Sequence, residues 1–574
     1  MKSWQQNWNN AKETVAKNFW HATLNFVFIL IFVNVFQKVF GMENSIVGVI
    51  FTIMMSASMV RDLTATPIRH LCLQTAILFV MATAACFVSN APPLIALGIN
   101  FAVIFLILYA FTYEYVSHLY FPYILSYLFL VFISPVTPQE LPKRLLGVFT
   151  GAVCIILYQL VTGRKRVVET THDVLIAMID RADECITHLL SGKEVVKEPE
   201  QLRADLCKLS KMVYDRRKRA LCISDASFAM IDSGRGLENL VLLLYEMEGP
   251  MTEQRRNLLQ QISSTLKSFR EFMSKNANDI PSLRQDDFLV SGNAEAEQFY
   301  RCLDYIRNHM MKMTSPEKRV HYPKSVLSLS VRLKAALHVS PVRVVYALRT
   351  SCLLAACTLF VQLLGLPHGK CLLFTVASVS LPYADDVCPK AKKRIMATLI
   401  GGLCSVVIFS LVPSATGRTL VMMLSGYLSF YFSDYQSTFA CSTVGALGGA
   451  IFMETFGWGP VGYMSIVRLE YIVIGVLVAL AVNCLILPFK RATATRQLWR
   501  KYASTTELLS KICRGPEIDS QLYYALVIQA HLQEDKLKQN AKALNWKGVD
   551  DLLEERRQAV RNAHRTRPAL GTSF

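Results

Sequence analysis

Two charged residues stand inside an otherwise apolar stretch near the end of the chain. Arg468 and Glu470 lie in VRLEYIVIGVLVALAVNCLILP, residues 467–488. Residues two apart do not face each other on a helix, so each side chain needs a partner on another element or contact with water. A charge inside a membrane costs about 3 kcal/mol even on the lenient insertion scale, which makes function the default hypothesis. An arginine that snorkels to the membrane surface is the structural alternative.

A second basic motif stands at the start of a predicted helix. In KKRIMATLIGG, residues 392–402, Arg394, Thr398 and Gly401 are spaced so that they share one helix face. Thr and Gly on that face permit close packing against another helix. Arg394 is therefore a candidate ligand for an anion, and a positively charged anchor at the cytoplasmic end of a span is the alternative.

Two more residues are candidates for a substrate path. Thr375 ends the motif GLPHGKCLLFT at 365–375, where a Gly-Leu-Pro turn leads into an apolar helix. Its hydroxyl could contact a substrate or bond the backbone of its own helix. Arg349, near the start of another apolar stretch, is a candidate anion ligand.

Three carboxylates are weaker candidates for a proton site. Glu114 and Asp434 each lie between the fourth and fifth apolar stretches of their half, and Glu454 lies near the outer end of the next stretch. Each could take up a proton during transport. A position in a loop that water reaches is the simpler explanation for Glu114 and Asp434.

Motifs for catalysis, nucleotides and metals are missing. The chain has no nucleotide fingerprint, no HExxH and no GxSxG, and its fifteen cysteines form no CxxC pair. We therefore expect no enzyme activity, no cofactor, no metal and no disulfide scaffold. The cysteines are expected to be free thiols that act as small hydrophobic residues.

Composition indicates a membrane protein. Of 574 residues, 52% are hydrophobic and 18% are charged, whereas soluble domains carry about 25% charged residues. Mean hydropathy is +0.31. The net charge of +18 is spread over all parts of the chain, which suits the flanks of a membrane protein and argues against nucleic acid as a partner. The lipid bilayer is the expected partner.

Twelve apolar stretches organise the chain, because a spanning helix needs about 20 mostly apolar residues. Six lie in residues 1–163 and six in 341–488, with polar segments at 164–340 and 489–574. The stretches are about 19–37, 46–60, 68–88, 92–111, 117–134, 143–162, 343–364, 370–383, 394–412, 419–433, 436–455 and 463–487. Apolar residues recur at helical spacing in both polar segments. The sequence predicts an all-α membrane protein with a helical domain between two membrane halves and a helical tail.

The basic loops predict the orientation. Lys and Arg gather near residues 61–70, 164–166, 390–394 and 490–491, and all of these fall on one side if the N-terminus is cytoplasmic. Both termini and both polar segments are then cytoplasmic, in a plasma or inner membrane. Arg144 falls on the opposite side.

The two apolar halves resemble each other. Thr52 falls on Thr375 and Asp62 on Asp385, both 323 positions apart, and Arg144 falls on Arg468 at 324. An even number of spans in each half makes this a parallel repeat, which is one standard plan for carriers. Both arginines are exceptions to the distribution of charge expected for the two halves, and they share one repeat position. This argues that both halves need an arginine there for structure or for function.

These motifs carry a family resemblance. The ordered set LGLPHG…T, R…T..G and RLE…G…LP resembles the fusaric acid resistance and aromatic acid exporter family, with its integral membrane transporter domain. The family pattern falls on Arg349, Gly365, Pro367, Thr375, Arg394, Thr398, Gly401, Arg468, Glu470 and Gly475. Cys371 and Ala397 depart from it, standing where an aromatic residue and a glycine are usual.

The resemblance implies proton-linked efflux of small organic anions such as aromatic carboxylic acids. Arg468 and Arg349 would then attract the anion. Glu470 would carry the proton, because desolvation favours the neutral form of a carboxyl group. The alternatives are an anion channel, and a scaffold or sensor that acts through residues 164–340. A homo-oligomer and a periplasmic adaptor protein are further partners that this plan allows.

Overall fold

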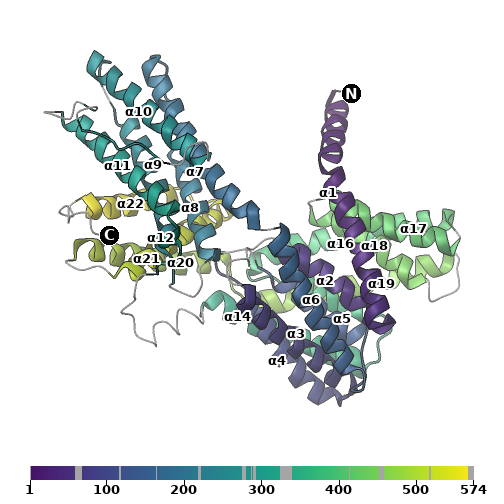
Figure 1. The fold of residues 1–574 in the computed structure, drawn as a ribbon. Helices are drawn as coiled ribbons and strands as arrows, with labels where there is room; N and C mark the ends of the chain where they lie inside the picture. Colours follow the sequence, from purple (N-terminus) through teal and green to yellow (C-terminus); the bar gives the residue numbers. More distant parts are fainter. Residues whose placement is uncertain are drawn as a thin grey trace. The chain divides into compact units, whose positions relative to one another are not determined.

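The computed structural model describes most of the chain. The described ranges are 2–58, 67–115, 118–162, 164–216, 222–247, 249–274, 279–285, 288, 293–322, 339–412, 414–432, 434–451, 458–515 and 519–565. Helices make up nearly all the regular structure of these ranges, and no strand occurs in them. The chain divides into two units, which are described separately (Figure 1).

The membrane unit holds residues 1–60, 68–157 and 340–491. Its first half contains α1 (Lys2–Phe40), η1 (Met42–Asn44), α2 (Ser45–Ser58), α3 (Pro67–Asn90), α4 (Pro93–Phe111), α5 (Tyr120–Phe132) and α6 (Leu141–Thr162). Its second half contains α14 (Pro341–Leu363), α15 (Lys370–Val379), η3 (Ala384–Asp386), α16 (Val387–Leu411), α17 (Ala415–Leu428), η4 (Ser429–Tyr431), α18 (Tyr435–Ile451) and α19 (Trp458–Leu485).

Among the described residues, seven helical segments are long and apolar enough to cross a membrane. They are Ala22–Phe40, Pro67–Asn90, Pro93–Phe111, Leu141–Leu160, Pro341–Leu363, Ala384–Leu411 and Val461–Leu485. The chain is thus a multi-pass membrane protein. Each of the twelve predicted stretches contains a helix, but five of these helices are shorter than a full span within the described residues, so the number of spans stays a prediction.

Helix length explains the difference. The 10 residues of α15 reach only about 15 Å, half of a hydrocarbon core of about 30 Å. Pro382 follows α15 closely, and the residue before a proline is disfavoured in the helical conformation. Hydropathy predicted an apolar stretch at 370–383 but could not show that the helix ends within it.

The two halves pack against each other through their helices. α4 packs along α14, and α5 packs on α15. The amide of Asn100 on α4 joins these pairs: its nitrogen donates to Thr358 Oγ1 at 3.2 Å, and its oxygen accepts from Tyr127 at 2.7 Å. A hydrogen-bonded amide at this depth fixes the register of the helices, because a polar group buried without a partner is costly.

One packing contact occurs in both halves. In α19, Gly475 leaves room for α15, since a Cβ at Gly475 would lie 3.2 Å from Thr375 Cβ. In α6, Gly151 leaves room for α2, since a Cβ there would overlap the ring of Phe51. The predicted repeat aligns Gly151 with Gly475 and Thr52, next to Phe51, with Thr375. This shared contact supports the repeat, which stays a prediction.

The polar unit holds residues 61–67, 158–339 and 492–574, and its described part is helical. Its helices are α7 (Arg164–Leu190), α8 (Pro199–Arg216), α9 (Asp225–Tyr245), α10 (Glu253–Met273), α11 (Ala294–Thr314), α12 (Pro316–Val320), α20 (Arg491–Arg514), α21 (Ser520–Leu544) and α22 (Val549–Arg565). The helices of the tail pack on the central segment: Glu534 of α21, fully buried, pairs with Arg203 of α8 at 2.8 Å and with Arg557 of α22 at 2.7 Å. The predicted domain limits at 163, 340 and 488 stay predictions.

Candidate functional site

Arg394, the arginine of the KKRIMATLIGG motif, is deeply buried. It lies in the second turn of α16 and is only 4% exposed. Its guanidinium stacks on the ring of Phe439 from α18, 4.4 Å from the ring centre. The Tyr435 side chain of α18 lies within reach of the guanidinium, no described residue forms an ion pair with it, and its Nε is buried without a partner. A buried guanidinium that lacks a counter-charge is costly, so this residue needs a further ligand or water.

Arg468 approaches the same place from α19. It lies close enough to Arg394 for the two like charges to repel each other. Its Nε is also buried without a partner, and no described residue accepts a hydrogen bond from it. Two guanidiniums therefore lie near enough to act on each other inside the membrane unit, and no described carboxylate pairs with either.

Two hydroxyl groups complete the cluster. Tyr435, the first residue of α18, places its buried hydroxyl near Arg394 and Ser378. Ser465 lies on α19, one turn before Arg468, and its hydroxyl is buried without a hydrogen-bond partner in the described structure. We call Arg394, Arg468, Tyr435 and Ser465 the cationic cluster.

Close helix packing holds the cluster together. A Cβ at Gly401 would lie 2.6 Å from the carbonyl oxygen of Ala440, so only glycine lets α16 approach α18 this closely. On the α19 side, Gly402 faces Ser465, with 3.7 Å between a Cβ built on the glycine and the serine Cβ. Gly401 and Gly402 thus explain why α16, α18 and α19 converge at this level.

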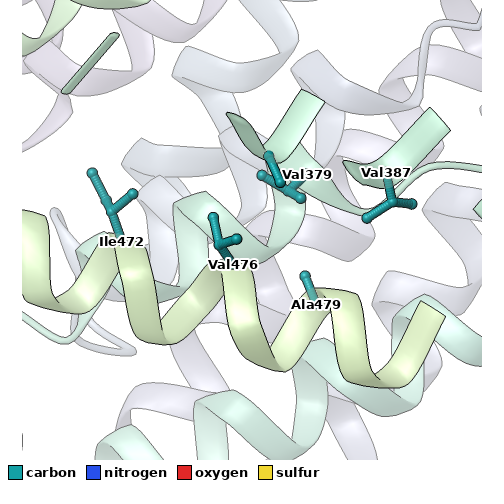
Figure 2. Packing of buried hydrophobic residues seen from close by; sticks show 6 residues of the cluster. Val379, Val387, Ile472, Val476 and Ala479 are labelled. Carbon is teal, nitrogen blue, oxygen red and sulfur yellow. The ribbon is translucent and has the colours of Figure 1, made fainter. Parts of the chain in front are cut away.

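An apolar core lies one turn away from the two arginines. Val379, Val387, Ala391, Ile472, Val476 and Ala479 form a buried cluster between α15, α16 and α19 (Figure 2). Ala391 is three residues before Arg394 and Ile472 is four residues after Arg468. The two arginines thus stand about one helical turn from an apolar core, and electrostatic interactions are stronger in apolar surroundings than in water.

Three other buried arginines in the membrane unit have quite different surroundings. Arg144 donates to the Asn44 side chain, to the Glu43 carbonyl at 2.9 Å and to the Ser134 carbonyl at 3.2 Å. Arg343 donates to the Tyr109 carbonyl. Arg349 donates to the carbonyls of Leu381 at 2.8 Å and Leu487 at 3.1 Å. These three arginines tie chain segments together, and Arg349 is held in this way instead of facing the cationic cluster.

The described carboxylates of the membrane unit do not neutralise the cluster. Asp434 is exposed and caps α18, accepting the Ser437 N–H at 2.8 Å. This hydrogen bond lowers the pKa of Asp434, which does not suit a proton carrier near neutral pH. Asp386 pairs with Arg491. Glu470 points out of the helix bundle and is exposed, with no ion pair among the described residues.

The predicted threonines act within their own helices. Thr375 donates to the Cys371 carbonyl at 2.8 Å and packs against Gly475. Thr398 donates to the carbonyl of Arg394 at 3.0 Å, one turn away. The structure therefore places Thr398 beside the cluster, whereas Thr375 has a packing role at the α15–α19 contact.

The remaining acidic candidates lie elsewhere. Glu114 is half-buried in the connection between α4 and α5. Glu454 lies outside the described residues. Of the predicted site residues, the structure thus brings together Arg394, Arg468 and Thr398.

Hydrogen-bond donors dominate the chemistry of the cluster. Guanidinium groups only donate, and both hydroxyls can donate. An arrangement of this kind suits an ionised carboxylate or another anion with several oxygens. No group of three His, Cys, Asp or Glu that could hold a metal occurs in the described ranges, and all fifteen cysteines are free thiols.

Comparison with known proteins gives one family match. Residues 354–482, which contain all four residues of the cationic cluster, match the family described as fusaric acid resistance protein-like. No curated protein and no solved structure shows a significant match to the chain. The match confirms the predicted resemblance: this part of the chain is similar to the fusaric acid resistance protein-like family of membrane transporters.

Proposed function

We propose that the protein exports small organic anions and that the cationic cluster is the anion site. One observation carries this proposal: Arg394 and Arg468 lie near each other inside the membrane unit, and no described carboxylate pairs with either of them. Structural arginines in the same unit are bonded to carbonyl oxygens. An uncompensated pair of charges that serves no structural tie is explained most simply by a ligand that supplies the missing charge.

Aromatic carboxylic acids fit the surroundings of the cluster. The ring of Phe439 already stacks on the Arg394 guanidinium, and the ring of Tyr435 lies beside it. Aromatic side chains at this point offer flat surfaces to an aromatic ligand. The family description names resistance to fusaric acid, so an organic acid is the substrate class that the match favours.

Proton linkage is the second part of the proposal. Glu470 is the carboxylate on the same span as Arg468, and an ionised carboxylate exposed at this depth is unfavourable in lipid. Protonation removes that cost, so proton uptake and release at Glu470 would change the stability of the two transport states. Its exposed position means that Glu470 would act through the helix and not by direct contact with the anion.

Flux measurements in proteoliposomes test the proposal. The purified chain is reconstituted, and uptake of benzoate, salicylate and succinate is measured with and without an imposed pH gradient. We expect gradient-driven flux that falls at least about tenfold in Arg394→Gln and in Arg468→Gln, because each removes one charged ligand. Lys393→Gln changes an exposed cation on the same helix and is the matched control.

Other outcomes separate the alternatives. Flux that is fast and indifferent to the pH gradient, but lost in both arginine variants, would identify an anion channel. If Glu470→Gln keeps gradient dependence, Glu470 is not the proton site. Absence of flux from well-folded protein for every acid would contradict the proposal and favour a scaffold that acts through the polar unit.

A further inference from the structure

We infer that the cationic cluster selects an anion with two negative charges over one with a single charge. The inference rests on the proposed function and specifies its substrate class. It follows from the charges around the cluster and from the way its donors are distributed over three helices.

The first step is a charge count. Arg394 and Arg468 bring two positive charges, and no described carboxylate forms an ion pair with either guanidinium. A single carboxylate between them would leave one positive charge uncompensated in surroundings that α15, α16 and α19 keep apolar. A dianion neutralises both, and buried charges are tolerated when they are paired.

A third cation strengthens the imbalance. Lys390 is four residues before Arg394 on α16, so it lies one turn away on the same face. Its ammonium group sits 5.2 Å from the centre of the Tyr435 ring. Asp386 lies near enough to act on Lys390, but this carboxylate is already paired with Arg491. The positive field along this face is therefore larger than one carboxylate can balance.

The second step concerns where the donors lie. Arg394 comes from α16, Tyr435 from α18, and Ser465 and Arg468 from α19. These donors do not form one fork that a single carboxylate could occupy, because they approach from different helices. Two acidic groups on one skeleton can each take a guanidinium and a neighbouring hydroxyl, which satisfies the buried donors.

Matched acids test the inference. Binding of isophthalate and benzoate to the full-length protein in detergent is measured by isothermal titration at neutral pH, where both acids are fully ionised. The pair shares one ring and differs in one carboxylate. We expect isophthalate to bind at least about tenfold more tightly, since the second charge meets a desolvated guanidinium. Succinate and butyrate form a second pair without a ring.

The arginine variants give the decisive readout. Arg394→Gln and Arg468→Gln should each weaken isophthalate much more than benzoate, so that the preference falls toward one. Lys393→Gln, which changes an exposed side chain, should keep the preference. Circular dichroism and size-exclusion profiles show whether each variant is folded.

Several results would overturn the inference. Benzoate binding as tightly as isophthalate, with both dependent on the arginines, rejects dianion selectivity and leaves the proposed anion site intact. A strong preference that neither arginine variant changes would place selectivity at another site. Failure of the folded wild type to bind any of the four acids would reject the proposed function itself.

Discussion

Arg144 and Arg468 lie 324 residues apart, at matching positions of the predicted repeat. The guanidinium of Arg144 donates several hydrogen bonds to nearby oxygens, whereas no described residue accepts one from the guanidinium of Arg468. Arg144 is 1% exposed and donates to the Asn44 side chain and to the carbonyls of Glu43 and Ser134. Arg468 has an unpaired, buried Nε and faces Arg394 instead. The first half uses this position to tie its loops together, whereas Arg468 makes no such tie and is free to bind the anion that we propose.

This difference predicts opposite effects on stability. Arg144→Gln should destabilise the folded chain by about 3–5 kcal/mol, because several buried acceptors lose their donor. Arg468→Gln should change stability by less than about 1 kcal/mol, or raise it, because it removes repulsion with Arg394. Thermal unfolding of both variants in anion-free detergent measures the difference. Equal destabilisation by the two substitutions would mean that Arg468 is a structural residue as well.

Adding a side chain at Gly401 is expected to show how strongly the site depends on the distance between α16 and α18. A Cβ at this position would lie 2.6 Å from the Ala440 backbone oxygen, so Gly401→Ala must push α16 and α18 apart. Arg394 on α16 and Tyr435 on α18 would then separate, and we expect anion flux to fall about tenfold or more. Gly426→Ala on α17 is the control, because nothing lies within 4 Å of a Cβ there. Unchanged flux in Gly401→Ala would show that the approach of these helices does not set the site.

Removing the charge of Lys390 is expected to weaken the capture of an anionic substrate in a salt-dependent way. It is half-buried at the start of α16, one turn before Arg394, and its charge adds to the positive field of the cluster. Lys390→Gln should raise the substrate concentration for half-maximal flux several-fold at low salt, with the maximal rate kept. The effect should shrink toward physiological ionic strength and above, where the Debye length is about 8 Å or less. A lowered maximal rate at every salt concentration would instead place Lys390 among the residues that act during transport.

The sequence predicted the two arginines of the site but not its hydroxyls. Arg394 and Arg468 stand out because a charge inside an apolar stretch is visible in one dimension. Tyr435 and Ser465 have ordinary residue types, and their buried hydroxyls come near the arginines only when α16, α18 and α19 meet. Glu470 was predicted at the site, but its position two residues after Arg468 turns it to the exposed face of α19.

Helix limits show the same contrast between local and tertiary information. Helix α9 begins at Asp225 because the Ser224 side chain accepts the Ser227 N–H at 3.3 Å. A serine directly before a helix is a local capping signal that stands in the sequence. The lengths of α5 and α15 could not be predicted from local sequence, because apolar residues continue beyond the point where these two helices end.

The buried side chain of His531 is expected to make the stability of the polar unit depend on pH. It is 4% exposed on α21, and its Nδ1 lies 2.5 Å from Ser210 Oγ on α8. Burial, followed by the positive charge of Arg203, holds the pKa of His531 well below its ordinary value, although Glu534 opposes this. The folded chain therefore keeps His531 neutral at a pH where the unfolded chain takes up a proton.

The sign of the effect follows from that difference. A histidine whose pKa is depressed on folding lets the unfolded state bind more protons, so stability falls as pH drops below about 6.5. Hydrogen exchange of α21 in the full-length protein, measured between pH 7.5 and 5, should show progressive loss of protection. His531→Gln should flatten this dependence, because the amide does not titrate, while His188→Gln on α7 is the matched histidine control. A pH profile of α21 that His531→Gln leaves unchanged would assign the loss of protection to other groups.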